Sequence, residues 1–351
     1  MTPEKLIKLL ASLVALATLA ACDNSQNSQS GEPGDEKVPQ LVYVTNGVDP
    51  FWNIAENGAL KAAEEFNAEV EVFMPPSASI EDQKRFLETK LITGVDGIAI
   101  SPIKPEAQNP DLKKYAEQTI LSTHDSDAPD SNRQFFVGMD NYKAGRAAGK
   151  LVKEVLPDGG KIMIFVGRLE QLNARQRRQG VIDEVLDLPM QSVNDLEVTP
   201  NGSPVQNDKY VILDTRTDEF DFARAKANAE DAINAYPELN CMVGLFAYNI
   251  PNCLQAVKQA GKVGDIKLVS FDENDMTLEG IKNGEVFGTI SQQPYEYGYH
   301  SIRILASLAR GDKSALPENN YLEIPIVVVR KDNVVPFHEK VVELRKSPSV
   351  N

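Results

Sequence analysis

Short apolar runs alternate with longer segments of helical periodicity along most of the chain. The predicted strands are 41–45, 70–74, 97–101, 119–123, 135–137, 161–166, 210–213, 242–246, 267–271 and 286–290. The predicted helices are 51–66, 80–91, 106–118, 142–155, 173–185, 222–235, 252–260 and 276–282. Strands that are joined through helices run parallel, with right-handed crossovers. The alternation therefore predicts an α/β fold.

The alternation of predicted strands and helices occurs in two successive sets along the chain. A chain of 351 residues is too long for one hydrophobic core. Two successive sets of alternating elements then indicate two doubly wound, Rossmann-like domains with parallel sheets. No short-period repeat accompanies them.

The N-terminus has the composition of an export signal. Lysines precede an apolar stretch, residues 9–21, which is too short for a comfortable transmembrane helix. It ends in Leu-Ala-Ala before Cys22, which resembles a bacterial lipobox. We expect residues 1–21 to be a signal peptide and Cys22 to be lipidated; an ordinary signal with an incidental cysteine is the alternative. Residues 22–39 are polar and predict a flexible tether.

An exported chain permits a disulfide between the two remaining cysteines, Cys241 and Cys253. Cys241 opens a predicted strand and Cys253 lies in the helix that follows. The length of the strand would keep the two sulfur atoms too far apart for a bond. We therefore expect two buried free thiols.

Charge and motif content exclude several functions. The chain has 36 basic and 51 acidic residues, a net charge of −15, and this balance argues against a nucleic-acid partner. No Gly-x-Ser-x-Gly turn and no Walker lysine loop occurs, so we expect no enzyme and no cofactor. His300 and His338 lie in no cluster, and no metal site is predicted.

Ligands of open parallel sheets bind beyond the carboxyl ends of the strands. The loops at these positions supply carboxylates, amides, arginines and aromatic rings. Planar polar groups pair with vicinal hydroxyls, and flat rings cover the C–H faces of a sugar. A hydroxyl-rich ligand is therefore expected. The candidate ligand-binding residues are Asp49, Phe51, Trp52, Asp125, Arg177, Phe220, Asn249, Asp272 and Gln292, with Asn46, His124 and Asp127 as further candidates.

Three short runs carry a family resemblance. Residues 49–52 (Asp-Pro-Phe-Trp), 94–98 (Gly-Val-Asp-Gly-Ile) and 271–273 (Phe-Asp-Glu) resemble the periplasmic sugar-binding proteins of ABC importers, in particular the ribose-, galactose- and xylose-binding type. The resemblance extends over about residues 40–332. It implies the type I periplasmic binding protein fold: two Rossmann-like lobes, joined by three hinge strands, that close on a ligand in the cleft between them.

The resemblance also implies roles for single residues. Phe51 and Trp52 match the stacking rings of the first lobe, and Phe220 matches the aromatic residue of the second lobe. Arg177, in the run Ala-Arg-Gln-Arg, matches the sugar-clamping arginine. The matches that remain are the two carboxylates Asp125 and Asp272, the amide of Asn249 and the hinge glutamine Gln292.

The sequence departs from the family pattern at two positions. Ser126 stands where the family has an arginine, and Asp49 stands where it has an asparagine. Asp127 adds a further acid. We expect a more acidic pocket and a ligand with additional donors, either an amino group or further hydroxyls. Residues 187–208 look like an insertion on the lobe surface, because breakers such as Pro189 and Gly202 interrupt them.

Each candidate residue has a purely structural alternative. Phe51 and Trp52 could belong to the core, and His124 could be a structural histidine. The side chains of Asp125, Asp272 and Asn249 could cap the helices that follow them. Arg177 could be a solvated charge on a helix face.

The expected organisation places residues 40–141 and 294–321 in the N-terminal lobe, and residues 142–293 and 322–345 in the C-terminal lobe. We expect a monomeric, extracytoplasmic protein that is anchored to the membrane only by lipid, in the periplasm if the source is Gram-negative. Its expected function is to bind a monosaccharide or polyol for an ABC permease and ATPase. Alternatives are a sensory protein that presents its ligand to a chemoreceptor or histidine kinase, and a binder of a non-sugar molecule.

Overall fold

The computed structural model of the chain describes residues 37–346. The predicted signal peptide, Cys22 and most of the predicted tether lie outside these residues. All of the elements named below belong to one unit, which begins at Val38. Within the described residues, no helix is long and apolar enough to cross a membrane.

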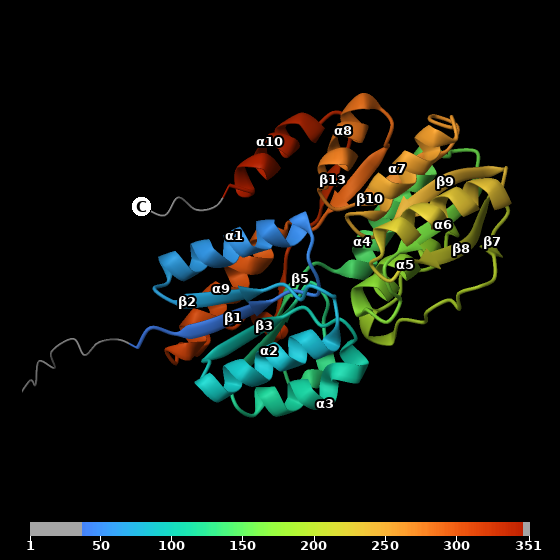
Figure 1. Ribbon diagram of the computed structural model, residues 1–351. Helices are drawn as coiled ribbons and strands as arrows, with labels where there is room; N and C mark the ends of the chain where they lie inside the picture. Colours follow the sequence, from blue (N-terminus) through green and yellow to red (C-terminus); the bar gives the residue numbers. More distant parts are fainter. Residues whose placement is uncertain (1–36, 347–351) are drawn as a thin grey trace, which may run out of the picture. The chain divides into compact units, whose positions relative to one another are not determined.

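The first sheet is parallel throughout and has the strand order β12-β5-β4-β3-β1-β2. Its strands are β1 (Gln40–Val44), β2 (Glu69–Phe73), β3 (Gly97–Ile100), β4 (Ile120–His124), β5 (Phe135–Gly138) and β12 (Tyr321–Glu323). Two helices cover each face: α1 (Pro50–Glu65) and α9 (Pro294–Ala309) on one, α2 (Ile80–Thr93) and α3 (Pro105–Ala116) on the other. We call this sheet and its helices the first lobe (Figure 1).

The second sheet has the order β13-β11-β10-β9-β6-β8-β7 and is parallel except at its two edges. Its strands are β6 (Gly160–Val166), β7 (Val205–Gln206), β8 (Tyr210–Thr217), β9 (Leu239–Gly244), β10 (Lys267–Phe271), β11 (Gly288–Ser291) and β13 (Val327–Val329). Its helices are α4 (Asn141–Val155), α5 (Leu172–Val185), α6 (Phe222–Ala235), α7 (Asn249–Gln259), α8 (Asp275–Asn283) and α10 (Val334–Leu344). Together they form the second lobe.

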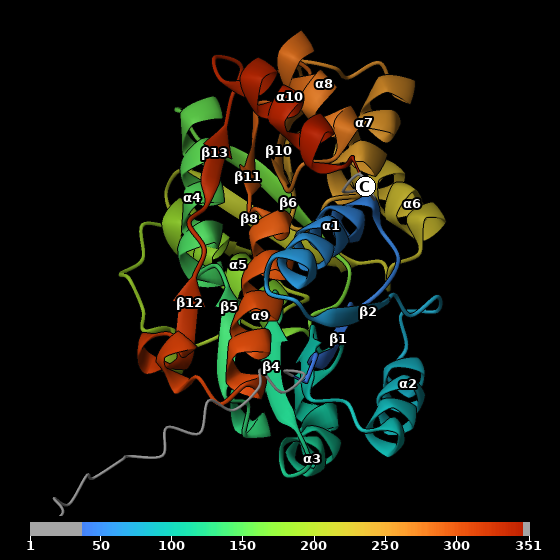
Figure 2. The ribbon, with the colours of Figure 1, turned by 90° about the vertical axis from the view of Figure 1, so that its left-hand side faces the viewer.

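Within the described residues, the chain passes between the two sheets three times. It leaves the first sheet after β5, returns after β11, and leaves again between β12 and β13; Figure 2 shows the last of these passages as an extended segment. The fold is thus the expected pair of parallel-sheet lobes with three connections. Leu322 and Glu323 pair with β5, so the third passage lies two residues later than the expected boundary at 321/322.

The central strands carry continuous apolar runs because both faces of each sheet are covered. In β6, Ile162 and Ile164 pack with α4 and α5, while Met163 and Phe165 pack on the opposite face with α6 and α7. All four side chains are buried. This two-sided burial explains why the strand pattern was visible in the sequence without any alternation of polar residues.

A pair of glycines allows α4 and α5 to cross closely. A Cβ atom on Gly145 would lie 2.1 Å from the carbonyl oxygen of Arg177, and one on Gly180 would lie 2.2 Å from that of Tyr142. No side chain fits at either position without moving a helix. The crossing therefore fixes the part of α5 that contains Arg177 against the start of α4.

Residues 187–208 connect α5 to β8 and lie over the outside of α5, as expected for a surface excursion. The backbone N–H of Thr199 donates to Gln179 Oε1 at 2.7 Å, and Arg178 donates to the Thr199 carbonyl at 2.6 Å. The segment contains a short 3₁₀ turn (Val193–Asp195) and the edge strand β7. Buried side chains of α5 thus hold the excursion in place.

Cys241 and Cys253 are buried free thiols, as predicted. Burial raises the pKa of both thiols well above the ordinary value. Neither sulfur is therefore a reactive thiolate at neutral pH.

Candidate functional site

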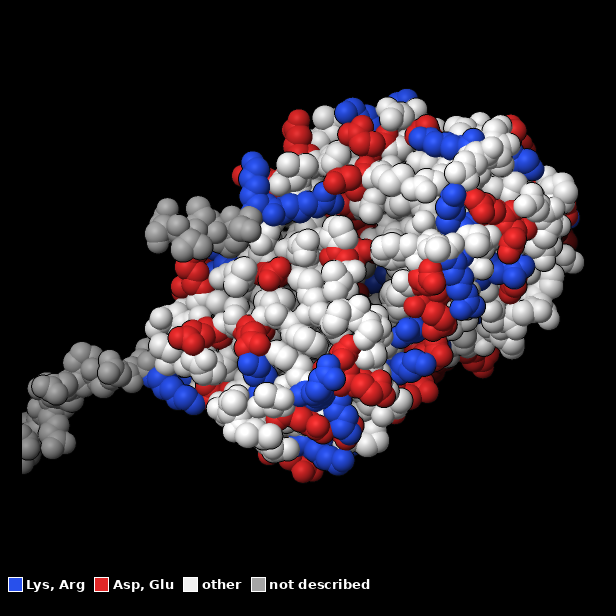
Figure 3. All heavy atoms as spheres, viewed as in Figure 1, with Lys and Arg blue, Asp and Glu red and all other residues white. Residues whose placement is uncertain are grey.

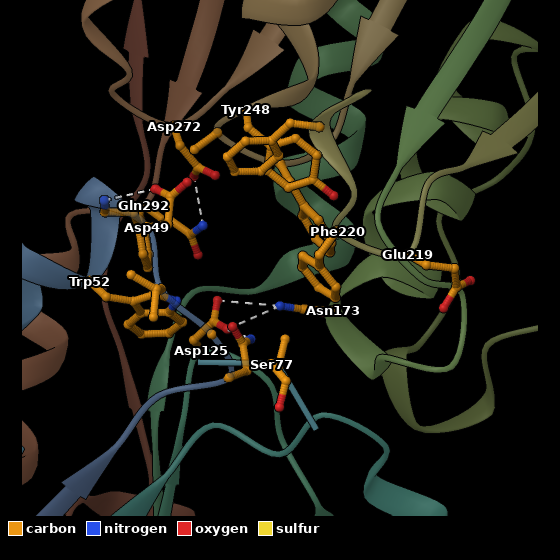
Figure 4. A pocket seen from close by; sticks show the side chains of 18 of the residues that line it. Asp49, Trp52, Ser77, Asp125, Asn173, Glu219, Phe220, Tyr248, Asp272 and Gln292 are labelled. Carbon is orange, nitrogen blue, oxygen red and sulfur yellow. Dashed lines mark hydrogen bonds between the residues drawn. The ribbon is translucent and has the colours of Figure 1, made fainter. Parts of the chain in front are cut away.

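A cavity lies between the two lobes, where the carboxyl ends of several strands meet. Its empty volume is about 870 Å³, part of it open to solvent, which is in the range of small-molecule sites. Figure 4 shows side chains from both lobes around it. The lining residues are Asn46, Gly47, Val48, Asp49, Phe51, Trp52, Pro76, Ser77, Ala78, Asp125, Asn173, Arg177, Glu219, Phe220, Phe222, Phe246, Ala247, Tyr248, Asp272 and Gln292.

The first turn of α1 supplies an acid and two rings. Asp49 is the N-cap of the helix, and its Oδ1 accepts from the backbone N–H of Phe51 at 2.9 Å. Pro50 follows at the first helical position, where its fixed φ favours the helix start. The rings of Phe51 and Trp52 meet edge to face at 4.8 Å between centroids. This cap geometry presents the carboxylate and both rings to the cavity.

Asp125 follows β4 directly and has a left-handed backbone, with φ 58°. Aspartate tolerates this conformation better than most residues. Its carboxylate accepts hydrogen bonds from Ser101 Oγ at 2.9 Å and from Asn46 Nδ2 at 3.4 Å, both in the first lobe. From the second lobe, Asn173 Nδ2 donates to both of its oxygens at 3.3 Å, as Figure 4 shows. Asp125 therefore connects the lobes at the base of the cavity.

Arg177 is 1% exposed and its guanidinium donates in several directions. Nε donates to Asn141 Oδ1 at 2.9 Å, and Nη1 donates to the Leu245 carbonyl at 3.0 Å. Nη2 donates to Gln292 Oε1 at 2.8 Å and lies 3.5 Å from the Asp125 carboxylate. The close crossing of α4 and α5 puts Arg177 beside Asn141. The guanidinium is thus held before any ligand arrives.

Gln292 lies on the passage from β11 back to the first lobe. Its Oε1 accepts from Arg177, and its Nε2 donates to Asp272 Oδ1 at 2.6 Å. Tyr297, on α9, also donates to Gln292 Oε1, at 3.2 Å. The backbone N–H of Met139, on the first passage, donates to the Tyr297 hydroxyl. Gln292 therefore joins the site to two of the connections between the lobes.

The second lobe contributes an aromatic wall. The ring of Phe220 is nearly parallel to that of Phe246, with centroids 5.8 Å apart. The guanidinium of Arg168 lies 5.0 Å from the centroid of the Phe220 ring. Tyr248 lies 6.1 Å from Phe220 and donates to the buried Asp218 at 2.5 Å. Glu219 and Phe220 both have a left-handed backbone, with φ of 59° and 63°. A phenylalanine in this conformation is a strained position of the kind found at binding sites.

Burial raises the pKa of all three aspartates in the cavity, Asp49, Asp125 and Asp272. The charge of Arg177 opposes this rise at Asp125 and Asp272. Behind the cavity, burial and then the charge of Asp272 raise the pKa of Glu273. Ionised carboxylates here are poorly solvated, so donors from a ligand would stabilise them.

Three predicted residues do not line the cavity. Asn249 starts α7; its Oδ1 accepts from the Phe246 backbone and its Nδ2 donates to Asp218, so it fixes the aromatic wall from behind. His124 is buried against Tyr43, with ring centroids 4.1 Å apart, and burial lowers its pKa to about 3. It is a neutral core histidine. Asp127 is paired with Arg133 and accepts from Thr123.

Ser126, at the position of the family arginine, is buried and does not line the cavity; its hydroxyl has no partner within the described residues. Asn46 and the eight principal candidates other than Asn249 do line it. The structural alternative therefore holds for His124. Asp49 both caps a helix and faces the cavity, and its capping role was not predicted.

Other lining residues were missed. Phe246 and Tyr248 follow the end of β9, and Ser77 lies in the loop after β2. Phe246 was placed inside the predicted strand 242–246, whereas β9 ends at Gly244. Asn173 opens α5 and bridges to Asp125, which no local pattern shows.

Residues 41–313 match the family model described as a periplasmic binding protein domain. The D-ribose/D-allose-binding protein of Pseudomonas aeruginosa is 23% identical over 254 residues, which cover 70% of this chain and 73% of that protein. The ribose import binding protein of Escherichia coli is 20% identical over 266 residues, covering 76% and 82%. Both relatives are binding proteins, not enzymes.

Solved structures share the fold. The ABC transporter solute-binding protein of Burkholderia graminis, in complex with D-arabinose, superposes with a TM-score of 0.76 at 23% identity, covering 86% of this chain and 98% of that one. The solute-binding protein of Agrobacterium vitis, bound with alpha-D-tagatopyranose, has a TM-score of 0.75 at 21% identity, with coverage of 86% and 98%. At this identity the likeness establishes the two-lobed architecture.

Proposed function

Because this chain belongs to the periplasmic binding protein domain family, we propose that it is the solute-binding protein of an ABC importer for a monosaccharide or a related polyol. It carries its ligand in the cavity between the lobes. The named relatives bind ribose, allose or other simple sugars by their descriptions. The same class of ligand suits the side chains of this cavity.

The observation that carries the proposal is the combination of polar and aromatic groups from both lobes. Asp125, Asn173 and Asp272 offer planar oxygen and nitrogen pairs that match vicinal hydroxyls. Trp52 and Phe220 offer flat faces for the C–H surface of a sugar ring. A deoxy analogue would leave one of these buried groups unpaired, which gives sharp selectivity.

The mechanism is closure of the two lobes about the three connecting segments. A ligand shifts the open–closed equilibrium only through contacts that differ between the two states. Trp52 and Asp125 act from the first lobe, and Phe220 and Asp272 from the second. A ligand that touches both sets binds the closed form more tightly, and the closed form then docks on a membrane permease driven by an ATPase.

Trp52 provides a direct test because it is the single tryptophan of the chain and lines the cavity. The chain from Asp23 onward is titrated with pentoses, hexoses, deoxy sugars, amino sugars and polyols. The proposal expects a saturable fluorescence change with one of them and a matching rise in melting temperature. Trp52→Phe serves as the control, with no fluorescence change but a remaining thermal shift. Silence in both signals across the panel would overturn the proposal.

Lipid attachment at Cys22 and an extracytoplasmic location are part of the same proposal. The lipobox-like sequence before Cys22 supports it. When cells that express the full chain are labelled with a fatty acid, the mature protein should carry the label and should sediment with membranes. Cys22→Ser should abolish both properties; a soluble, unlabelled wild-type protein would contradict the anchor.

A further inference from the structure

The charges that line the cavity do not balance. Its acidic residues are Asp49, Asp125, Asp272 and Glu219, and its single basic residue is Arg177. Glu219 is neutralised by Arg168, which lies 2.8 Å away. The charge of Arg177 acts on Asp125 and Asp272, and the charge of Arg345, which lies outside the lining, acts on Asp49. Three carboxyl groups thus share two guanidinium groups, and acidic side chains outnumber basic ones in the lining.

Arg177 has little capacity to serve a ligand. Four of its five N–H groups point at Asn141, Leu245, Gln292 and Asp125. Its guanidinium is also packed between the rings of Phe246 and Phe271, at 5.5 and 5.2 Å from their centroids. This arginine is a structural part of the site, and its charge is shared among groups that surround it.

Two carboxylates keep an oxygen free for a ligand. Asp49 receives a single hydrogen bond, from the Phe51 backbone to Oδ1. Asp272, which is 3% exposed, also receives a single side-chain bond, from Gln292 to Oδ1. The second oxygen of each has no hydrogen-bond partner among the described residues, and both side chains line the cavity. Carboxylate oxygens that face a cavity between two lobes gain a donor when a ligand displaces the water there.

Aromatic faces accompany these carboxylates. Figure 4 shows Trp52 beside Asp49 and Phe220 on the opposite side of the cavity. Tyr248 also lines the cavity. The negative face of an aromatic ring attracts a cation, most strongly when both are removed from water. Free carboxylate oxygens and ring faces together form the usual environment for an ammonium group. Figure 3 shows the surface hollowed where the lobes meet. On this face, acidic and basic residues are interspersed, and no patch of basic residues surrounds the hollow.

We infer that the ligand of this site carries a protonated amino group, as an amino sugar or an aminated polyol does, and that Asp49 and Asp272 bind this group. The inference rests on the proposed function and narrows its substrate class. The ammonium N–H groups donate to the free oxygens of the two carboxylates, which are charge-assisted hydrogen bonds. The remaining hydroxyls of the ligand pair with Asp125 and Asn173. Burial of the carboxylates on closure is then compensated by the charge of the ligand.

Matched compounds test the charge directly. The chain from Asp23 onward is titrated with D-glucosamine, D-galactosamine and D-mannosamine, each beside its parent hexose and its N-acetyl derivative, and with 1-amino-1-deoxysorbitol beside sorbitol. Trp52 fluorescence and calorimetry report binding. At least one amine should bind tenfold more tightly than both its neutral parent and its N-acetyl derivative.

The outcomes separate this inference from the proposed function. If a neutral sugar binds as tightly as its amine, or more tightly, the inference of a cationic ligand is wrong, whereas the proposed sugar-binding function still holds. Absence of binding by every amine and every neutral compound, in both readouts, would overturn both.

Charge-removing variants give a second test. Asparagine is as good an N-cap as aspartate, so Asp49→Asn should fold. With the amine that binds wild type, Asp49→Asn and Asp272→Asn should each lose at least tenfold in affinity, and the preference over the neutral parent should disappear. Asp221→Asn is the matched control, because Asp221 is the exposed N-cap of α6 and lies outside the cavity lining. It should change the affinity less than twofold. An amine preference that survives in both cavity variants would contradict the assignment.

Discussion

The guanidinium of Arg177 lies 3.5 Å from the carboxylate of Asp125, across the boundary between the two lobes. Asn173 spans the same boundary to the same carboxylate. Both contacts lie at the base of the cavity, and both are made by the protein alone. The lobes therefore share a polar contact that sets their separation at this point, and a ligand binds above it.

The first prediction concerns Arg177. Arg177→Met leaves the acceptors of Asn141 and Leu245 buried without a donor, whereas Gln292 keeps the hydroxyl of Tyr297. We expect a loss of about 3 kcal/mol in the free energy of unfolding, as for a broken buried ion pair, measured by urea denaturation. Arg224→Met, at an exposed position of α6, should change the stability by less than about 0.5 kcal/mol. A loss of less than about 1 kcal/mol in Arg177→Met would contradict this account.

The second prediction concerns an ion pair between the lobes. Arg175, in the second lobe, lies 2.9 Å from Glu106 in the first. Arg175→Glu replaces attraction by repulsion and disfavours the closed arrangement. Because exposed pairs contribute about 1 kcal/mol or less, ligand affinity should fall by about two- to fivefold. The measurement is calorimetric titration with the ligand found in the panel.

The double variant Arg175→Glu/Glu106→Arg restores the attraction and should recover the affinity. Lys84→Glu is the control, since Lys84 pairs with Asp111 inside the first lobe, at 2.8 Å. Its affinity should match that of wild type. Failure of the double variant to recover affinity would show that the pair does not affect closure.

The third prediction concerns the left-handed backbone of Phe220. Removal of the ring by Phe220→Ala or Phe220→Gly should weaken ligand binding in both variants. Alanine keeps the conformational cost of about 1 kcal/mol, whereas glycine does not have it. We therefore expect the glycine variant to be the more stable of the two by about 1 kcal/mol in urea denaturation.

The same pair of changes at Phe246 should give the opposite order. Phe246 packs against Phe220 but does not have a positive φ. At an ordinary φ, glycine lowers stability relative to alanine because it increases the entropy of the unfolded chain. If the alanine and glycine variants had the same order of stability at both positions, backbone strain at Phe220 could not explain that order.

The fourth prediction is a pH dependence of stability. Burial raises the pKa of Asp218 to about 6, although Tyr248 and Asn249 donate to it. The folded protein therefore binds more protons than the unfolded chain between the ordinary aspartate value and pH 6. Stability falls as the pH rises through this window. Asp218 alone should contribute a loss of about 1 kcal/mol between pH 5 and pH 7.

Asp49, Asp125 and Asp272 act in the same direction, because burial raises their pKa values as well. Urea denaturation at both pH values measures the slope. Asp218→Asn should be less stable than wild type at both pH values but should show a shallower slope. A wild-type stability that rises from pH 5 to pH 7 would refute the assignment of these pKa shifts.

Local sequence patterns predicted the parts of the fold that are determined by local burial. The strand Lys267–Phe271 and the helix Phe222–Ala235 agree residue for residue with the structure. The edge strands β7, β12 and β13 were not predicted, because they are short and form by pairing with distant residues. The last two helices, α9 and α10, were also missed.

The candidate site was predicted in outline because parallel sheets place strand ends together. The pattern did not give the direction of each side chain. His124 ends β4 but faces the core beside Tyr43, while the next residue, Asp125, faces the cavity. Asn249 follows β9 but turns back to Asp218. The direction in which each of these side chains points depends on packing against residues far away in the sequence, so the residues at one strand end do not predict it.

The three passages between the sheets also determine the order in which a nascent chain can be finished. The first lobe begins with β1, yet its edge strand β12 and its helix α9 come from residues after the whole core of the second sheet. The first lobe can therefore be completed only after the central strands of the second sheet have been synthesised. Until α9 is synthesised, the side of α1 that packs closely against α9 is uncovered, so an interrupted translation product would expose it to aggregation.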